Sequence, residues 1–178
     1  MKTAPIFSHD GKTVLWSVVY SGLPPLLLEM RYENGAWSAP ARPLFASSTS
    51  ADIYPSFSVD GKQLFFSSKR PLPPGYPPLR DWGIWVVEKR NTGWGEPSPL
   101  DTTVSSGREY AHSISRNETI YFSSRRHEEG YFDIFSSRKE DGKYLTPEAL
   151  ANGINTEGYE DGPYILTRWE DGTMVRSV

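Results

Sequence analysis

Apolar residues along this chain alternate with polar ones or gather in short runs, and no window shows the spacing of an amphipathic helix. The segment Pro55–Ser68 is the clearest case: an alternating run is followed by Asp60-Gly61 and by the apolar run Leu64–Phe66. Alternation is typical of half-buried strands, and Asp-Gly suits a tight hairpin because glycine accepts a positive φ at little cost. The segment therefore predicts a β-hairpin.

The hairpin pattern recurs along the chain. Pro5–Lys12 repeats its beginning 50 positions earlier, and His112–Ser124 repeats it 57 positions later, with Arg116-Asn117-Glu118 in place of the Asp-Gly turn. A recurring unit of this length indicates a repeat architecture in which equivalent positions are buried in the same way. Phe57 and Ile114 are therefore predicted to be equivalent.

A second landmark gives the register independently. An aromatic residue stands three positions before a proline, with spacings of 57 and 50 positions, in the pairs Trp37 and Pro40, Trp94 and Pro97, and Tyr144 and Pro147. The extra residues of the second unit lie mostly in the proline-rich stretch 71–78. We predict a loop there, because proline lacks the donor that a strand ladder needs.

Each unit holds one further apolar run between the hairpin and the aromatic landmark, at 26–32, 83–88 and 132–137. Four strands per unit follow, placed in the second unit at about 53–58, 63–68, 83–88 and 93–100. Four short antiparallel strands in about 50 residues are typical of a β-propeller blade. We predict one all-β domain over 1–178, with blades at about 4–46, 52–102 and 109–152 and a partial blade at 159–178.

The residues Pro55–Ser68, with their Pro-x-Phe-Ser-x-Asp-Gly-Lys start and aromatic-Ser-Ser strand, resemble the TolB-type WD40-like (PD40) repeat family. Gly130–Phe135 and Asn155–Pro163 are similar to the third strand and the link between blades of that family. The resemblance covers nearly the whole chain and implies a β-propeller. Two departures stand in the third unit, where His112 replaces the usual proline and the turn lacks Asp-Gly.

About three and a half blades fall short of a closed ring. A propeller removes its open sheet edges by bringing the last blade against the first. The count predicts a partial propeller or half of an oligomeric ring, and we keep three alternatives: a piece of a longer chain, a homo-oligomer that shares one ring, or a distorted four-bladed monomer.

Composition and charge limit the classes of partner and the cellular compartment that the chain can be expected to have. The formal charge of -3 and pI near 5.7 provide no broad basic field, which argues against nucleic acid. The absence of cysteine excludes disulfides and thiolate metal sites, and the longest apolar run, Leu26–Leu28, is far too short to span a membrane. The start of the chain lacks the apolar core of a signal peptide, which predicts a cytoplasmic protein, whereas the family resemblance implies a periplasmic or secreted one.

Charged residues are predicted to meet on one face of the blades. Three acidic residues begin first strands and four basic residues follow second strands, and antiparallel pairing places these ends side by side. Two interpretations stay open: ion pairs within a blade, or a charged lining of the channel mouth that receives a ligand. The residues are Asp52, Glu109 and Glu160, with Lys69, Arg70, Arg125 and Arg126.

Other candidates come from breaks in the repeat. His112 is predicted to face or adjoin the channel, and Tyr76 and Trp82 belong to the insertion and are predicted to be more exposed than the repeat aromatics. Some sugar-acid lyases that resemble PD40 proteins use channel histidines, but the spacing of His9, His112 and His127 suggests no metal site. The pairs Ser67-Ser68 and Ser123-Ser124 recur in register and are predicted to be scaffold.

The sequence contains no nucleophile elbow, zinc-protease motif or phosphate loop. We therefore predict a non-enzymatic binding or scaffolding module without a cofactor or metal, which recognises protein or carbohydrate at the channel mouth. The alternative is a carbohydrate-active enzyme, or the propeller portion of a larger hydrolase, because function resides in sites and not in the fold.

Overall fold

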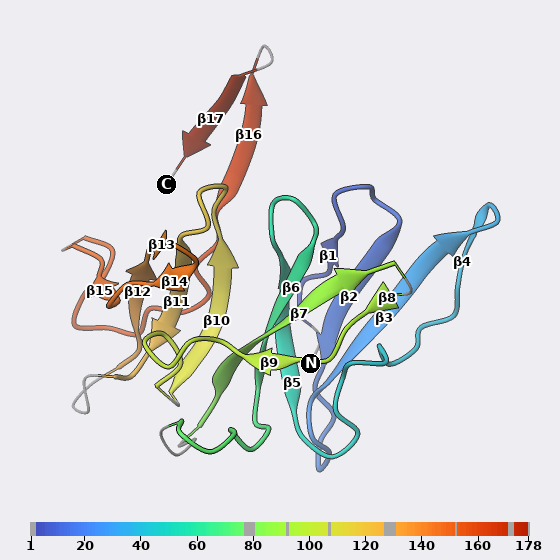
Figure 1. The fold of residues 1–178 in the computed structure, drawn as a ribbon, viewed down its shortest axis with the longest axis horizontal. Helices are drawn as coiled ribbons and strands as arrows, with labels where there is room; N and C mark the ends of the chain where they lie inside the picture. The colour runs from blue at the N-terminus through green and yellow to red at the C-terminus, as the bar shows by residue number, and fades with distance from the viewer. Residues whose placement is uncertain are drawn as a thin grey trace.

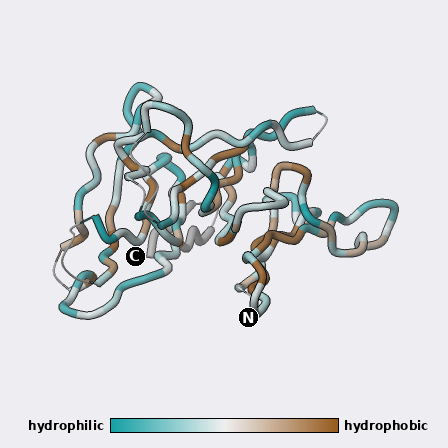
Figure 2. Tube along the Cα trace, turned by 90° about the horizontal axis from the view of Figure 1, so that it is seen from below, coloured by the Kyte–Doolittle hydropathy of each residue, from teal (hydrophilic) through white to brown (hydrophobic). Residues whose placement is uncertain are grey.

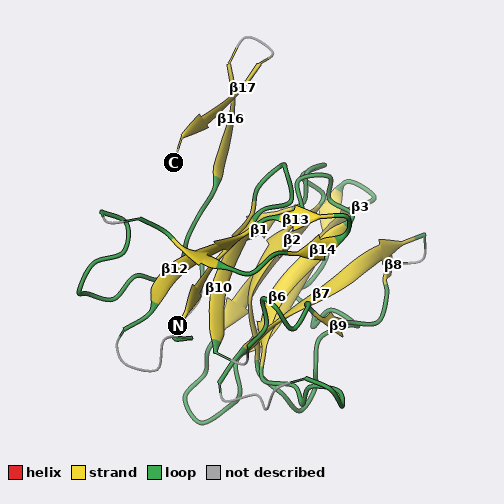
Figure 3. Cartoon of the chain, turned by 60° about the vertical axis from the view of Figure 1, so that its left-hand side comes forward, coloured by secondary structure: helices red, strands yellow, loops and turns green. Residues whose placement is uncertain are grey.

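The computed structural model describes residues 3–76, 81–91, 93–106, 108–126, 131–151, 153–170 and 173–177, with only the backbone described from 166 onward. Every regular element in these ranges is a strand (Figure 3). His127 and residues 77–80, which belong to the predicted loop, lie outside them.

Three antiparallel sheets, of four, five and four strands, follow one another along the chain (Figure 1). Sheet 1 has the order β1-β2-β3-β4 and sheet 2 the order β5-β6-β7-β8, with β9 also paired to β7; sheet 3 has the order β10-β11-β12-β15. This confirms the predicted four strands per unit. The bounds are β1 Ile6–Phe7, β2 Thr13–Val18, β3 Leu26–Glu33, β4 Ala36–Trp37, β5 Asp52–Phe57, β6 Gln63–Ser68, β7 Gly83–Arg90, β8 Gly93–Trp94, β9 Ser98–Pro99, β10 Glu109–Ile114, β11 Ile120–Ser124, β12 Asp133–Ser137 and β15 Glu148–Ala149.

Two hairpins complete the described chain. β13 (Lys139–Glu140) pairs with β14 (Lys143–Tyr144), and β16 (Leu166–Glu170) pairs with β17 (Thr173–Ser177). The three sheets lie side by side, and β5 contacts both β1 and β10, so the first strands of neighbouring sheets meet (Figure 1).

The predicted register of the aromatic landmarks is confirmed by strand pairing. Trp37, Trp94 and Tyr144 each lie opposite the residue five positions earlier, namely Tyr32, Lys89 and Lys139. In Figure 2 several loops that protrude from the trace are hydrophilic.

The core of the described chain contains three clusters; the smallest is Ala51, Ile53 and Trp82, and the two larger ones lie between sheets. One joins sheets 1 and 2 around Leu15, Leu27 and Phe66, and the other joins sheets 2 and 3 around Phe65 and Phe122. Phe65 and Phe66 thus point to opposite neighbours, because successive side chains of a strand face opposite sides. Phe57 packs toward sheet 1 and Ile114 toward sheet 2, in agreement with their predicted equivalence.

The first strands share a bulge that the sequence pattern does not show. The pairing register shifts between Ile53 and Ser56, and again between Tyr110 and His112. Within these shifts Tyr54 has φ 51° and Ala111 has φ 23°. Side chains rarely adopt this left-handed region, and bulges often re-aim neighbouring side chains. His112 is the first paired residue after the shift in sheet 3.

Candidate functional site

A groove of about 690 Å³ runs along the first strands of the three sheets and the segment 162–165. No charged side chain lines it among the described residues. Its lining residues are Thr3, Ala4, Pro5, Ile6, Phe7, Tyr54, Pro55, Ser56, Phe57, Val59, Ala111, His112, Ser113, Ile114, Gly162, Tyr164 and Ile165.

His112 is the one titratable imidazole in this groove, and it stands where neighbouring units have Pro55 and Pro163. It is only 6% exposed, and neither ring nitrogen has a hydrogen-bond partner of good geometry in the described chain. Burial lowers the pKa of His112 to about 4, against a smaller opposing effect of the Phe65 backbone. At neutral pH the ring therefore carries one donor and one acceptor, of which the Phe65 backbone uses at most one.

Serine hydroxyls near His112 also lack partners. The Oγ atoms of Ser56 and Ser113, at equivalent positions of β5 and β10, are buried without a hydrogen bond in the described chain, and so is Ser67 Oγ. The residues equivalent to Ser67 are satisfied: Tyr54 N–H donates to Ser17 Oγ at 2.9 Å, and Gly162 N–H to Ser123 Oγ at 3.2 Å. The junction of sheets 2 and 3 therefore holds a serine hydroxyl without a partner where the equivalent serines of the other units are satisfied.

Such groups are costly. Each buried polar group without a partner destabilises the fold by about 1–3 kcal/mol unless water or a ligand satisfies it. A cluster of them along an open groove is what a binding site needs, and the sequence predicted only its His112 member. The sequence feature that pointed to His112 was the replacement of the repeat's proline by histidine. Ser56 and Ser113 could not be found in this way, because serine is common throughout the repeat.

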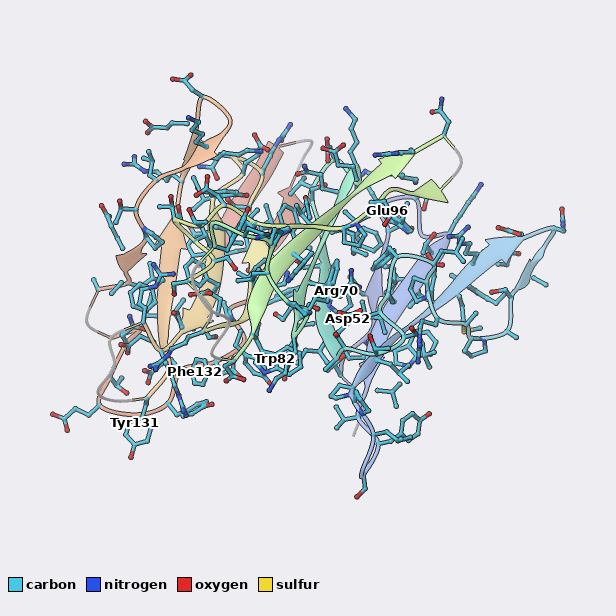
Figure 4. All side chains as sticks on the ribbon, turned by 60° about the horizontal axis from the view of Figure 1, so that its bottom comes forward. Asp52, Arg70, Trp82, Glu96, Tyr131 and Phe132 are labelled. Carbon is cyan, nitrogen blue, oxygen red and sulfur yellow. The ribbon has the colours of Figure 1, made fainter. Side chains whose placement is uncertain are left out.

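The acidic and basic candidates form buried ion pairs. Asp52 accepts a hydrogen bond from Ser68 Oγ at 2.6 Å and one from Arg70 Nη2 at 2.7 Å, and Arg70 also donates to the Phe45 carbonyl at 2.8 Å. The guanidinium lies over the Phe66 ring, with 5.1 Å to its centroid. Figure 4 shows Asp52 and Arg70 adjacent.

The same arrangement recurs in sheet 3. Arg126 Nη2 lies 3.2 Å from Glu109 Oε1 and donates to the Val104 carbonyl at 2.7 Å, over the ring of Phe122. Burial lowers the pKa of Arg126, and the Glu109 carboxylate opposes that shift. The interpretation as ion pairs within a sheet is thus confirmed for Arg70 and Arg126. None of the four residues lines the groove, and a ligand role for them stays a prediction.

Arg125 and Lys69 instead lie over aromatic rings. Arg125 stands 4.5 Å from the Phe132 centroid and Lys69 4.8 Å from that of Trp82, while Lys69 Nζ also pairs with Asp81 at 3.1 Å. Trp82, Phe132 and the exposed Tyr131 lie along the same side of the molecule in Figure 4. This edge combines cations and rings but borders no described part of the groove.

The prediction that Trp82 would be more exposed than the repeat aromatics is wrong. Trp82 is 9% exposed and packs against Tyr110, whereas Trp37 is 41% exposed. The reason is that Trp82 directly precedes β7 and occupies the position of Phe132, so it belongs to the repeat and not to the insertion. Tyr76 is half-buried in the insertion, where its N–H donates to the Pro73 carbonyl.

The three acidic residues occupy equivalent backbone positions, although only Asp52 and Glu109 begin a described strand. The N–H groups of Asp52, Glu109 and Glu160 donate to the carbonyl oxygens of Pro25, Trp82 and Phe132 at 3.1, 3.1 and 2.9 Å, each on the preceding sheet. The described residues contain no group of three or more histidine or acidic side chains that could hold a metal. They also contain no helix long and apolar enough to cross a membrane.

Comparison with solved structures identifies the fold. TolB from Acinetobacter baumannii matches with a TM-score of 0.51 and 20% identity over 83% of this chain. A puromycin-hydrolyzing peptidase from Mycobacterium tuberculosis (0.53, 14%, 85%) and a prolyl endopeptidase (0.52, 20%, 92%) also match. This chain is an all-β protein with the fold of a β-propeller.

The match is confined to architecture. The chain spans 33% of the TolB structure and 23% and 22% of the two peptidase structures. No family model matches the sequence, and no curated protein matches it. Identities of this size establish the fold, so the activity must be argued from the groove and the residues that line it.

Proposed function

We propose that this chain is a non-enzymatic binding module whose ligand lies in the groove along the first strands. The observation that carries the proposal is His112, a nearly buried imidazole whose nitrogens make no well-aligned hydrogen bond in the described chain, beside the unused hydroxyls of Ser56 and Ser113. A ligand that reaches them recovers hydrogen bonds that the protein leaves unmade. The groove volume lies within the range of ordinary ligand sites.

The lining favours an uncharged, extended protein segment over a glycan. Ten of the seventeen lining residues are apolar, including every proline, isoleucine and phenylalanine among them. A glycan would need more polar groups than the six residues Thr3, Tyr54, Ser56, His112, Ser113 and Tyr164 offer. A peptide backbone presents one donor and one acceptor per residue, which matches a neutral imidazole flanked by hydroxyls. Charged ligands are disfavoured because no charged side chain among the described lining residues would balance them.

A second candidate is the propeller portion of a larger hydrolase. It is supported by the two peptidase structures, of which the chain matches less than a quarter. In that case the groove would admit or hold a substrate whose cleavage takes place on another domain. No observation among the described residues favours a carbohydrate-active enzyme.

Selection of ligands on the purified chain tests the proposal. A displayed library of random ten-residue peptides and a glycan array are screened in parallel, and hits are measured by titration calorimetry against the wild type and His112→Phe. We expect uncharged, apolar peptides whose affinity falls at least about tenfold in His112→Phe, because one buried hydrogen bond to a ligand is worth about 1.4 kcal/mol or more. Tyr20→Ala, an exposed position outside the groove, is the matched control and should bind normally.

Three results would contradict the proposal. Peptides that bind His112→Phe and the wild type equally would show that the binding site lies outside the groove. Hits from the glycan array alone would show that the ligand is a carbohydrate and not a peptide. Turnover of selected peptides by the chain itself would show an enzyme instead of a binding module.

A further inference from the structure

A second cavity, of about 560 Å³, lies between sheets 2 and 3, at the end where tight turns join their first and second strands. Its volume is within the range of small-molecule sites. Only Val59 and Ile114 also line the groove described above. All of its lining residues belong to these two sheets, their turns and β14: Ser58, Val59, Asp60, Lys62, Gln63, Phe65, Glu88, Lys89, Ile114, Ser115, Arg116, Glu118 and Tyr144.

The equivalent place between sheets 1 and 2 is nearly filled. The cavity there measures only about 110 Å³. The Trp94 ring lines it and donates through Nε1 to Glu29 at 3.4 Å, and Arg31 pairs with the same carboxylate at 3.0 Å. A large ring and an internal ion pair therefore close this junction.

The wider cavity between sheets 2 and 3 follows from four replacements. Two rings are exchanged for smaller side chains, which leaves space. The internal ion pair is exchanged for a valine and a carboxylate that has lost its partner. Strand pairing and the repeat register give the counterparts: Tyr144 for Trp94, Ile114 for Phe57, Val86 for Glu29 and Glu88 for Arg31.

The cavity has an apolar floor and one polar wall. The floor consists of Phe65, Ile114 and Tyr144, all buried members of one core cluster. On the wall, Gln63 lies directly opposite Glu88 and on the same face of the sheet as Phe65, because alternate residues of a strand share a face. Neither polar side chain has a hydrogen bond or ion pair to another described residue.

The other charged residues of the lining are engaged or face away. Lys89 extends from the opposite face of β7 to Glu88 and also lines the smaller cavity, and Arg116 is engaged within the chain. The wall carboxylate is therefore the charge that a ligand in this cavity can neutralise. The remaining carboxylates are paired with lysines, Asp60 with Lys62 at 3.7 Å and Glu118 with Lys139 at 2.8 Å.

We propose that this cavity binds a small primary amine with an apolar body. The ammonium group donates to the Glu88 carboxylate and to the Gln63 carboxamide oxygen, and the body packs on the apolar floor. An ammonium group has three donors, and hydrogen bonds between a cation and a carboxylate are stronger than neutral ones. The aromatic faces of the floor also attract a cation. This site is separate from the groove of the proposed function.

Three compounds with one phenyl body provide the probes. Phenethylamine, phenethyl alcohol and phenylpropionate carry an ammonium, a hydroxyl and a carboxylate group, and each is titrated onto the purified chain at neutral pH and followed by amide chemical shifts. We expect saturable shifts at Gln63, Glu88 and Tyr144 with phenethylamine. Its affinity should exceed that of the alcohol at least about tenfold, since a hydrogen bond to a charged group is stronger than a neutral one. Phenylpropionate should not bind.

Two variants locate the bound amine. Glu88→Gln keeps the shape of the wall but removes its charge, and should weaken phenethylamine binding at least about tenfold. Glu33→Gln, at an exposed carboxylate of sheet 1 outside the cavity, is the matched control and should bind as the wild type does. Tyr144→Trp gives the third unit the ring of the second and should abolish binding by filling the cavity, while urea unfolding checks that the variant is folded.

Three results would overturn the proposal. Equal affinity for the amine and the alcohol, or unchanged binding by Glu88→Gln, would show that the apolar floor alone holds the compound. Tighter binding of phenylpropionate would show that the lining cations determine the ligand and that it is an anion. Binding that survives in folded Tyr144→Trp would show that the amine lies outside this cavity.

Discussion

Trp94 and Trp37 occupy the same position of the repeat and have different surroundings. Trp94 packs against Phe45 and Phe57, and its Nε1 donates to Glu29 of sheet 1 at 3.4 Å. Trp37 contacts Phe7 and Tyr32 on its own sheet and is 41% exposed. The difference is that sheet 1 covers sheet 2, whereas no described segment covers the corresponding side of sheet 1. In this fold a residue is buried by the neighbouring sheet more than by its own.

The largest effect is expected where a side chain lies fully inside a covered junction. Phe66→Ala should destabilise the chain by about 3–5 kcal/mol, because Phe66 is completely buried between sheets 1 and 2. Phe7→Ala, on the uncovered side of sheet 1, should cost less than about 1 kcal/mol. Urea unfolding followed by circular dichroism measures both. Equal costs would mean that the uncovered side is packed in solution.

Buried charges give the next comparison. Arg70→Ala should cost about 3–5 kcal/mol, since it leaves the Asp52 carboxylate buried without its cation. Lys62→Ala removes the exposed pair with Asp60 and should cost less than about 1 kcal/mol. Unfolding at pH 7 compares the two variants. A small cost for Arg70→Ala would show that water reaches Asp52 and that the junction of sheets 1 and 2 is open.

His112 makes the junction of sheets 2 and 3 sensitive to pH. Its pKa is lowered from 6.5 to about 4, so between pH 6.5 and 4 His112 is protonated in the unfolded chain and neutral in the folded chain. The contribution is fully present above pH 6.5 and is lost as the pH falls toward 4. The loss of unfolding free energy by pH 4 amounts to roughly 3 kcal/mol, because one pKa unit corresponds to about 1.4 kcal/mol.

The variant His112→Phe isolates this effect. Carboxylates titrate in both proteins, so the difference between their pH profiles of unfolding free energy belongs to His112. The variant should also be more stable than the wild type at pH 7, because it removes two buried nitrogens without partners. Parallel pH profiles between pH 7 and 4 would show that the imidazole is hydrated.

The repeat register could be predicted from the sequence, whereas burial and the groove largely could not. Two landmarks located the four strands of each unit because side-chain type and turn chemistry recur with the strands. The exposure of Trp37 and the burial of Trp82 depend on which sheet lies opposite, and a pattern within one unit carries no information on that. The unused hydroxyls of Ser56 and Ser113 depend on bulges at Tyr54 and Ala111 whose positive φ neither side chain signals.

The last prediction tests the uncovered side itself. Phe7, Tyr32 and Trp37 form a connected aromatic patch on sheet 1, and all three are more than 40% exposed. Soluble monomers rarely keep such patches in water, so the purified chain should self-associate as its concentration rises. Light scattering should show a rising average mass for the wild type and a smaller rise for Trp37→Ser, while unfolding free energies of the two differ by less than about 1 kcal/mol. Tyr131→Ser, at an exposed aromatic on sheet 3, is the control and should associate as the wild type does. The opposite result is a chain that stays monomeric at high concentration and whose Trp37 fluorescence, taken as the difference from a Trp37→Phe variant, is protected from acrylamide quenching. It would show that the chain covers this side itself. The contrast between Trp37 and Trp94 would then vanish in solution.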